Sequence, residues 1–354
     1  MTTPPTPDAT AIRTVLQRLA QRADLGTSEI QDAFRLIMRG EADHTEIGAL
    51  LMALSDRGES SEVLVGIVQA MREVMLPVRF PANQLAVDTC GTGGGAIRTL
   101  NISTAAAFLV AGAGIPVAKH GNRSFTSRSG SADVLEALGI ATDTGPDSAA
   151  RVLSQAGIVF LFAPTFHPAM RHLAAIRRSL AVTTVMNLVG PLANPAGVQR
   201  QVIGVADPAV APSIASALRG LGCVRGMVVH GEIGIDEISP VGLTHVWDVD
   251  GGGITVAVID PETLGLATPN LGGTEGGSPE ANAAAIERLL NNPSAAPRAL
   301  RSAVILNAAA AILVSGTVTD FARAAQQAMA ALDEGKAAER LSALRAAAPL
   351  RTSG

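Results

Sequence analysis

LAVDTCGTGGGAIRTLNIST, residues 85–104, is the stretch that decides the fold class of this chain. Its first three residues are apolar and favour a short strand at 85–87. A glycine-rich loop at 91–95 follows, and an Ala-rich helix begins near Ser103. A strand that leads through a short loop into a helix is typical of a parallel sheet covered by helices.

The same alternation of short apolar runs and Ala/Leu-rich helical patterns continues toward the C-terminus. It predicts a larger α/β domain over 81–348, with a mainly parallel central sheet covered by helices. The Gly-rich stretch 270–278 is predicted to be a loop. Further strands are expected at 117–118, 159–162, 202–205, 227–229 and 257–259, and further helices at 103–113, 132–138, 211–221 and 279–290.

The N-terminal part has a different pattern. Residues 1–10 are rich in Pro and Thr and predict a disordered tail. The sequence SEIQ at 28–31 has the form of a capping box that begins a helix, with Gly40 as its stop. Two more helices are expected at 45–56 and 61–75. We therefore predict a small α-helical domain over 11–80, joined by helices from about 165–185, whose apolar faces pack against each other or against a second subunit.

The composition limits the classes of partner. A formal net charge of -4 and a pI of about 5.9 give no global attraction to nucleic acid or to an anionic membrane. The N-terminus lacks the pattern of a signal peptide, and no apolar run reaches the roughly 20 residues of a membrane span. Two distant cysteines, Cys90 and Cys223, form no disulfide framework, which favours the cytoplasm.

The loop at 91–95 suits phosphate. Glycines let backbone N–H groups approach phosphate oxygens, and a helix N-terminus adds partial positive charge. Ser103 and Thr104 contribute hydroxyl groups there. The simpler alternative is a flexible turn with a helix cap. Cys90 as a nucleophile is a further alternative, which explains the glycines less well.

A second polar loop covers 119–133, KHGNRSFTSRSGSAD, after an expected strand and before an expected helix. Lys119, the hydroxyl groups and the backbone N–H groups of this stretch could hold a polyanion. The alternative is a solvated surface loop.

Two carboxylates, Asp236 and Glu237, follow the expected strand at 227–229. Mg²⁺ takes one or two carboxylates together with substrate phosphates and water. An ordinary acidic turn is the alternative. The metal interpretation requires that this pair, Ser103 and Lys119 converge on one cleft.

One more segment could hold a carboxylate-bearing ligand. Arg177 follows the sequence FHPAM at 166–170, and NLVGPLANP at 187–195 comes after it. A guanidinium binds a carboxylate through two parallel hydrogen bonds. A surface arginine is the commoner alternative.

Taken together, these segments resemble the anthranilate phosphoribosyltransferase family, which acts in tryptophan biosynthesis. The resemblance covers about 12–346. It implies a helical domain used for dimerisation, an α/β domain, and transfer of a phosphoribosyl group from phosphoribosyl pyrophosphate to anthranilate with the help of Mg²⁺. The resemblance is carried by KHGNR at 119–123, SGSAD at 129–133, FAPTFHPAMRHLAAIRR at 162–178, NLVGPLANP at 187–195 and GIDEIS at 234–239.

The resemblance also implies roles for individual residues. Ser103, Asp236 and Glu237 would hold magnesium, and Lys119 would act electrostatically, with no residue assigned as acid or base. The acceptor would meet Gly91, His120, Asn122, His167 and Arg177. The donor would meet Gly91, Thr92, Gly94, Gly95, Thr99, Asn101, Ile102, Ser103, Thr104, Lys119, His120, Gly121, Asn122, Arg123, Ser124, Ser127 and Ser131.

The chain departs from the family pattern at several positions. Gly95 stands where the family usually has Asp, which predicts an altered Mg²⁺ dependence or a looser grip on the donor. Ser179, Ala181 and Thr183 replace Glu, Gly and Arg, and Ile233 replaces Asp. These changes leave open a divergent paralogue that uses another aromatic amine.

Two further alternatives come from other classes. A pyrimidine-nucleoside phosphorylase would need a Lys-Met-Ser-Gly-Arg type of loop where this chain has KHGNR. A non-catalytic relative that binds nucleic acid would need a basic groove, which the pI of about 5.9 does not favour.

Overall fold

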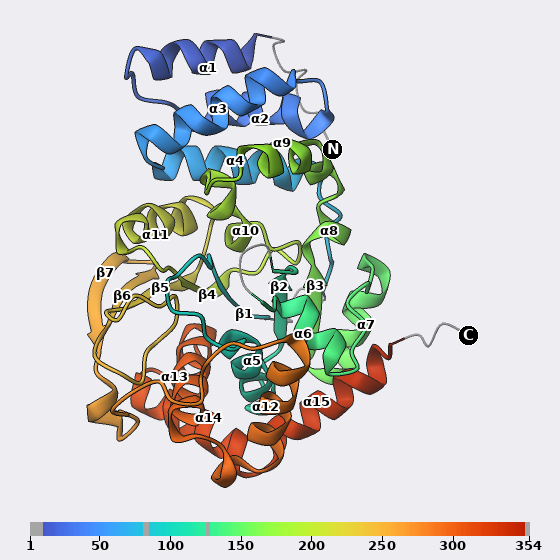
Figure 1. The fold of residues 1–354 in the computed structure, drawn as a ribbon, viewed down its shortest axis with the longest axis vertical. Coiled ribbons are helices and arrows are strands. Elements are labelled where there is room, and N and C mark those ends of the chain that lie inside the picture. Colours follow the sequence, from blue (N-terminus) through green and yellow to red (C-terminus); the bar gives the residue numbers. More distant parts are fainter. Residues whose placement is uncertain (1–9, 81–84, 125–127, 351–354) are drawn as a thin grey trace.

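The computed structural model describes residues 10–80, 85–124 and 128–350. The tail predicted at 1–10 lies outside the described residues except for Thr10, and so does Ser127. Helices α1 to α4 form a layer at one end of the molecule, and the sheet with the C-terminal helices forms the larger remainder (Figure 1). This arrangement confirms the predicted fold class.

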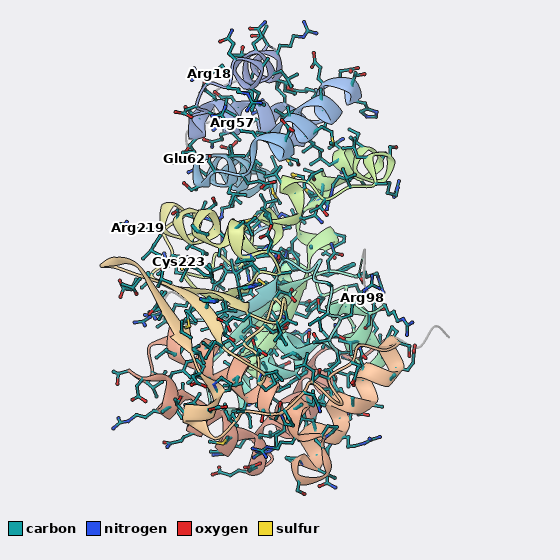
Figure 2. All side chains as sticks on the ribbon, turned by 60° about the vertical axis from the view of Figure 1, so that its left-hand side comes forward. Arg18, Arg57, Glu62, Arg98, Arg219 and Cys223 are labelled. Atoms are coloured by element: carbon teal, nitrogen blue, oxygen red, sulfur yellow. The ribbon has the colours of Figure 1, made fainter. Side chains whose placement is uncertain are left out.

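The helical layer is built from amphipathic helices that bury one apolar face each. Its members are α1 (Ala11–Ala20), α2 (Thr27–Arg39), α3 (His44–Arg57) and α4 (Ser61–Val74). A segment far along the chain, α9 (Arg171–Leu180), packs against α2 and α3. Figure 2 labels Arg18 and Arg57 on this layer, where they pair with Glu29 at 3.2 Å and Asp24 at 2.9 Å.

The capping box predicted at 28–31 is wrong. Helix α2 begins at Thr27 with Gly26 as its N-cap residue, and the Gly26 N–H donates to the Glu29 carboxylate at 2.8 Å. Glycine is accepted at this position because the reciprocal bond from Glu29 satisfies the free backbone donor. The helices expected at 45–56 and 61–75 are confirmed within one residue at each end.

The larger part contains a mixed sheet in the order β1-β4-β5-β6-β7 and a parallel pair β2-β3. The pairs β1-β4, β4-β5 and β2-β3 are parallel, and a parallel bridge between Val87 and Val117 links the two sheets. The strands are β1 (Asp88–Gly91), β2 (Val117–Gly121), β3 (Ile158–Phe162), β4 (Arg200–Gly204), β5 (Arg225–Gly231), β6 (Thr244–Asp250) and β7 (Gly253–Ile259).

Two details of the predicted sheet need correction. The first strand begins at Asp88, so the run at 85–87 leads into it and makes only an isolated bridge. The strand β6 was not predicted, and it makes β5, β6 and β7 an antiparallel meander. Asp250 and Gly251, at the turn from β6 to β7, are a hairpin signal that could have revealed it.

Helices cover the sheet and bury its apolar residues. The longest, α13 (Arg298–Ser315), has a mean hydropathy of 1.4 and is long and apolar enough to cross a membrane, but 89% of it is buried inside the protein. It is therefore a core helix. The other helices are α5 (Ile102–Gly112), α6 (Ser131–Ala137), α7 (Pro146–Ala156), α8 (Ala163–Phe166), α10 (Val189–Leu192), α11 (Ala211–Gly220), α12 (Pro279–Asn291), α14 (Phe321–Asp333) and α15 (Lys336–Ala347), with short 3-10 turns at Pro168–Met170, Val185–Asn187, Pro208–Val210, Pro261–Leu264 and Pro293–Ala295.

The apolar side chains form two cores. One lies among the strands and helices α5, α7 and α12 to α15. The other joins α1 to α4, α9, α10 and α11 with one face of β4 and β5. Because the second core crosses from the helical layer to the sheet, that layer is fixed to the strand ends that carry the site.

Candidate active site

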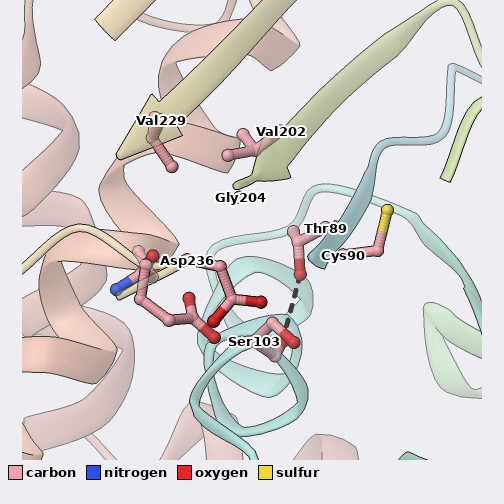
Figure 3. Close-up of a pocket in the computed structure, with 9 residues that line it drawn as sticks. Thr89, Cys90, Ser103, Val202, Gly204, Val229 and Asp236 are labelled. Atoms are coloured by element: carbon pink, nitrogen blue, oxygen red, sulfur yellow. Dashed lines mark hydrogen bonds between the residues drawn. The ribbon is translucent and has the colours of Figure 1, made fainter. Parts of the chain in front are cut away.

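A pocket opens at the carboxyl ends of the parallel strands β1, β4 and β5, where ligands of open α/β sheets commonly bind. In Figure 3 the Asp236 carboxylate and the Ser103 side chain point toward one another, with Thr89 beside them. The residues that line the pocket are Thr89, Cys90, Ser103, Val202, Gly204, Val229, Asp236, Glu237 and Asn307.

The first glycine-rich loop lies against the acidic pair. The Gly93 N–H donates to the Asp236 carboxylate at 3.0 Å. A side chain at Gly91 would place its Cβ 2.4 Å from the same carboxylate, so any larger residue would displace Asp236 from its position. Within the described residues, the N–H groups of Gly94 and Gly95 have no hydrogen-bond partner. They are therefore available to a ligand.

Lys119 connects the second loop to the first. It lies in β2 with 3% of its surface exposed, and its ammonium donates to the Thr89 carbonyl and to the Ser103 hydroxyl, the latter at 3.2 Å. Thr89 in turn donates to the Ser103 carbonyl at 3.1 Å (Figure 3). Ser103 is the second residue of α5, so a lysine, a hydroxyl group and a helix N-terminus meet at one point.

The acidic pair lies in the loop between β5 and β6. Burial, and then the neighbouring Asp236, raise the pKa of Glu237 to about 8, while burial raises that of Asp236. A cation bound between these two side chains would favour their charged forms. Within the described residues there is no cluster of three or more His, Cys, Asp or Glu side chains. The two carboxylates of Asp236 and Glu237 instead fit Mg²⁺, which completes its coordination shell with substrate oxygens and water.

Asn307 was not predicted as a site residue. Its side chain accepts from the Ile238 N–H at 2.9 Å and donates to the Ile238 carbonyl at 3.0 Å, next to Glu237. It therefore fixes the backbone of the acidic loop. An amide within the otherwise apolar run 303–314 of helix α13 was the signal that could have revealed it.

Of the residues expected at the acceptor, Gly91 lies beside the Asp236 carboxylate, His120 lies in β2 and Arg177 lies in α9. Arg177 is half-buried in α9, and burial lowers its pKa, with no acidic group raising it in the described part of the chain. His120 and His167 are 5% and 4% exposed, with ring centroids 5.2 Å apart. Burial lowers the pKa of His120 to about 3 and that of His167 to about 4, so both rings are neutral near pH 7.

Several other predicted residues are engaged within the protein. Arg123 pairs with Asp133 at 2.8 Å and with Glu136 at 2.6 Å. The Ser131 hydroxyl donates to the Asn122 carbonyl at 3.2 Å. These bonds shape the second loop, and the ion pairs hold the Arg123 guanidinium on helix α6.

The positions near α5 also have structural partners. The Asn101 side chain accepts from Asn282 at 3.0 Å and donates to the Ser129 carbonyl at 3.2 Å. Thr99 forms an antiparallel bridge with Glu275 from the predicted loop at 270–278. That loop therefore closes over the start of α5.

The departures from the family pattern have identifiable surroundings. A Cβ at Gly95 would lie 3.3 Å from both the Ala206 Cβ and the Gly234 carbonyl, which is tight but not blocked. Ala181 caps α9 in the left-handed region with φ of 52°, a conformation that favours glycine.

Comparison with known proteins gives a consistent result. Residues 83–338 match the family described as "Glycosyl transferase family, a/b domain", and residues 13–75 match "Glycosyl transferase family, helical bundle domain". The chain is 45% identical to the anthranilate phosphoribosyltransferase of Rhodopseudomonas palustris (strain BisB18) over 332 residues, which is 94% of this chain and 96% of the relative. It is also 45% identical to the enzyme of Rubrobacter xylanophilus over 326 residues, with 92% and 94% of the two chains covered.

Solved structures are similar along the whole fold. The crystal structure of anthranilate phosphoribosyltransferase from Thermus thermophilus has a TM-score of 0.87 at 39% identity, covering 94% of this chain and 98% of that chain. The Saccharomyces cerevisiae enzyme, in complex with PRPP and Mg, has a TM-score of 0.87 at 24% identity, covering 96% and 98%. The latter likeness concerns the fold alone.

Proposed function

The chain belongs to the anthranilate phosphoribosyltransferase family, and from that premise we propose that its cleft joins anthranilate to the ribose of phosphoribosyl pyrophosphate, releasing pyrophosphate. The observation that carries the proposal is the meeting of Lys119, Ser103 and the carboxylates of Asp236 and Glu237 at the end of β1. A cation, a helix N-terminus and a metal-type carboxylate pair suit a pyrophosphate group.

The donor is held by the first loop and by Lys119. The free N–H groups of Gly94 and Gly95 and the N-terminus of α5 offer hydrogen bonds to phosphate oxygens. The Lys119 ammonium can neutralise the charge that develops on the pyrophosphate as its bond to the ribose carbon breaks. Since this ammonium is already held by Thr89 and Ser103, little reorganisation is needed.

Ser103, Asp236 and Glu237 would hold Mg²⁺. When bound, the metal would neutralise part of the pyrophosphate charge and orient its oxygens. Asn307 positions this loop through Ile238.

The acceptor is oriented by Arg177, whose guanidinium can bind the anthranilate carboxylate through two parallel hydrogen bonds. The amine nitrogen then forms its bond to the ribose carbon as the bond from that carbon to pyrophosphate breaks, and it gives up one proton to water. His120 and His167 are poor bases because their pKa values are lowered to about 3 and about 4. We assign no general base, and positioning of the two substrates supplies much of the rate.

The test follows the fluorescence of anthranilate as it is consumed with donor and Mg²⁺. We expect consumption by the wild type and its loss in Asp236→Asn and Glu237→Gln, while Glu262→Gln, at an exposed position of the turn Pro261–Leu264, remains active. Absence of consumption by the wild type, with turnover of a substituted anthranilate in its place, would identify a divergent acceptor. No turnover of any aromatic amine would overturn the proposal.

The surroundings of the site are part of the same proposal. We divide the chain into a helical domain at 11–80, extended by the helices of about 165–185, and an α/β domain at 81–348. The helical domain would pair two copies in a homodimer, which light scattering after gel filtration can measure. A cytoplasmic location is supported by the two free cysteines, Cys90 and Cys223.

A further inference from the structure

The segment that follows α9 is held in an unusual way. Residues 190–195, GPLANP, contain two prolines and run along the boundary between the helical layer and the sheet. Successive groups of this segment are bound by side chains or backbone from different elements. The Gly190 carbonyl accepts from His120, and Ala193 bonds with His167. The Pro191 carbonyl accepts from Gln201 at 2.6 Å, and the Leu192 carbonyl accepts from Arg72 at 3.1 Å. The Pro195 carbonyl accepts from the Val78 N–H at 2.9 Å.

Asn194 makes the contact that reaches the site. Its side-chain amide donates to the Asp88 carboxylate at 2.7 Å and to the Ala118 carbonyl at 2.9 Å. The other oxygen of Asp88 accepts from the His120 N–H at 3.2 Å. The peptide groups on both sides of Lys119 are therefore held by one pair of side chains.

Asp88 is the only carboxylate with a fully buried side chain among the described residues, with 0% exposure. A buried carboxylate is costly unless its oxygens are satisfied and a cation lies near. Here both oxygens are hydrogen-bonded, and Lys119 supplies the nearby charge. The Lys119 ammonium returns to the carbonyl of Thr89, the residue next to Asp88. Side-chain hydrogen bonds from Lys119 to Thr89 and from His120 N–H to Asp88 thus join strands β1 and β2 beside the donor site.

We propose that Asp88 and Asn194 are positioning residues for the transfer, which fix the acceptor side of the cleft at a set distance from Lys119. The inference rests on the proposed function. Neither residue needs to touch a substrate. His120 and His167 lie on the acceptor side and bond to Gly190 and Ala193, while Asn194 anchors the same segment to the strand that carries Lys119. A displacement of about 1 Å between two bound reactants can lower a rate about 100-fold.

The variant Asp88→Asn tests this most directly. It keeps the shape of the side chain but places an amide N–H₂ against a second donor, either Asn194 or the His120 N–H. We expect kcat to fall about 100-fold, whereas the KM values for donor and anthranilate change less than about threefold. A purely structural role would lower Tm without this separation of kcat from KM.

Asp248→Asn is the matched control. Asp248 pairs with Arg225 at 2.9 Å in the same sheet, outside the pocket, so the variant makes the same chemical change and also destabilises the protein. We expect its kcat to stay within about twofold of the wild type at a temperature well below Tm. Activity of wild type and Asp248→Asn, with kcat lost in Asp88→Asn, supports the inference; an inactive wild type would instead overturn the proposed function.

Asn194→Ala gives a second, independent measurement. It removes the bonds to Asp88 and Ala118, together with the acceptor of the Ala196 N–H, and keeps the Asp88 charge. We expect the same fall in kcat. If either variant folds and keeps kcat within about threefold of the wild type, the inference is wrong. If neither folds, the pair is a requirement of folding rather than of alignment, and the inference is also overturned.

Discussion

The loop at 91–95 and the segment between β2 and α6 each follow a parallel strand and precede a helix, but their described residues are held very differently. The first is tied by the Thr92 N–H to Gly204 at 2.9 Å and by the Gly93 N–H to Asp236, and Gly94 faces open space at φ of 84°. The second is held by Asp133 of α6, which accepts from the Gly130 N–H at 2.8 Å and the Ser124 N–H at 3.2 Å.

This difference indicates that the two segments have different roles, ligand binding in the first and structural support in the second. The first loop leaves the N–H groups of Gly94 and Gly95 available to a ligand, whereas the described polar groups of the second segment bond within the protein. A density of cations and hydroxyl groups in sequence therefore does not by itself mean that each of them binds a ligand. Changes in the first loop should act on substrate affinity, and changes in the second should act first on stability.

Lys119 joins the two loops, and its replacement should have the largest effect. Lys119→Met removes the buried cation, so we expect kcat/KM for the donor to fall about 1000-fold. The fluorescence assay of anthranilate consumption measures this. Lys336→Met, at the exposed start of α15, is the matched control and should leave the rate unchanged. Equal activity of the two variants would show that Lys119 serves the fold alone.

His120 of β2 and the neighbouring His167 are buried and neutral, which predicts a loss of stability in acid. The folded pKa values of His120 and His167, about 3 and about 4, lie below the unfolded value of 6.5. Protons therefore bind preferentially to the unfolded chain as the pH falls below 6.5. At pH 5 each histidine should cost about 2 kcal/mol.

Urea unfolding between pH 7 and pH 5 measures this loss. The double variant His120→Gln/His167→Gln cannot take up these protons, so its midpoint should depend less on pH. An unchanged pH dependence in the double variant would mean that other groups cause the acid sensitivity.

The hydrogen bonds that hold the second segment can be weakened by replacing Asp133. In Asp133→Asn the one remaining side-chain oxygen cannot both accept from the Gly130 and Ser124 N–H groups and pair with Arg123, so the free energy of unfolding should fall by about 1–2 kcal/mol. Urea denaturation measures the change, and Asp143→Asn at an exposed position is its control. A large rise in donor KM at unchanged stability would contradict the structural role given to this loop.

The smallest effect is expected in the first loop at Gly95. Gly95→Asp adds a carboxylate near Ala206 and Gly234, and these neighbours, 3.3 Å from the added Cβ, need to move only slightly. We expect the Mg²⁺ concentration for half-maximal activity to change a few-fold, with Tm within about 2 °C. Gly95→Ala, which adds the Cβ alone, separates the effect of charge from that of bulk. If neither the metal requirement nor the donor KM moves, Gly95 is irrelevant to the grip on the donor.

The alternation of elements, the helical layer and the places of the glycine loops and of the acidic pair could all be predicted from the order of residues. These features depend on periodicity and on turn chemistry within about 20 residues, and such local preferences survive in almost any surroundings. The misplaced cap at 28–31 and the missed strand β6 show the limit of local patterns. The hydrogen bond between the Gly26 N–H and Glu29 decided where α2 begins, and pairing with β5 decided that β6 is a strand.

Which polar groups meet depended on the packing of distant segments. Asp88 and Asn194 lie 106 positions apart, and Asn307 reaches Ile238 across 69, so no local pattern could pair them. The same is true of Arg123, whose guanidinium found Asp133 and Glu136. Burial gives such contacts their strength, because a polar group removed from water must find a partner wherever the fold brings one.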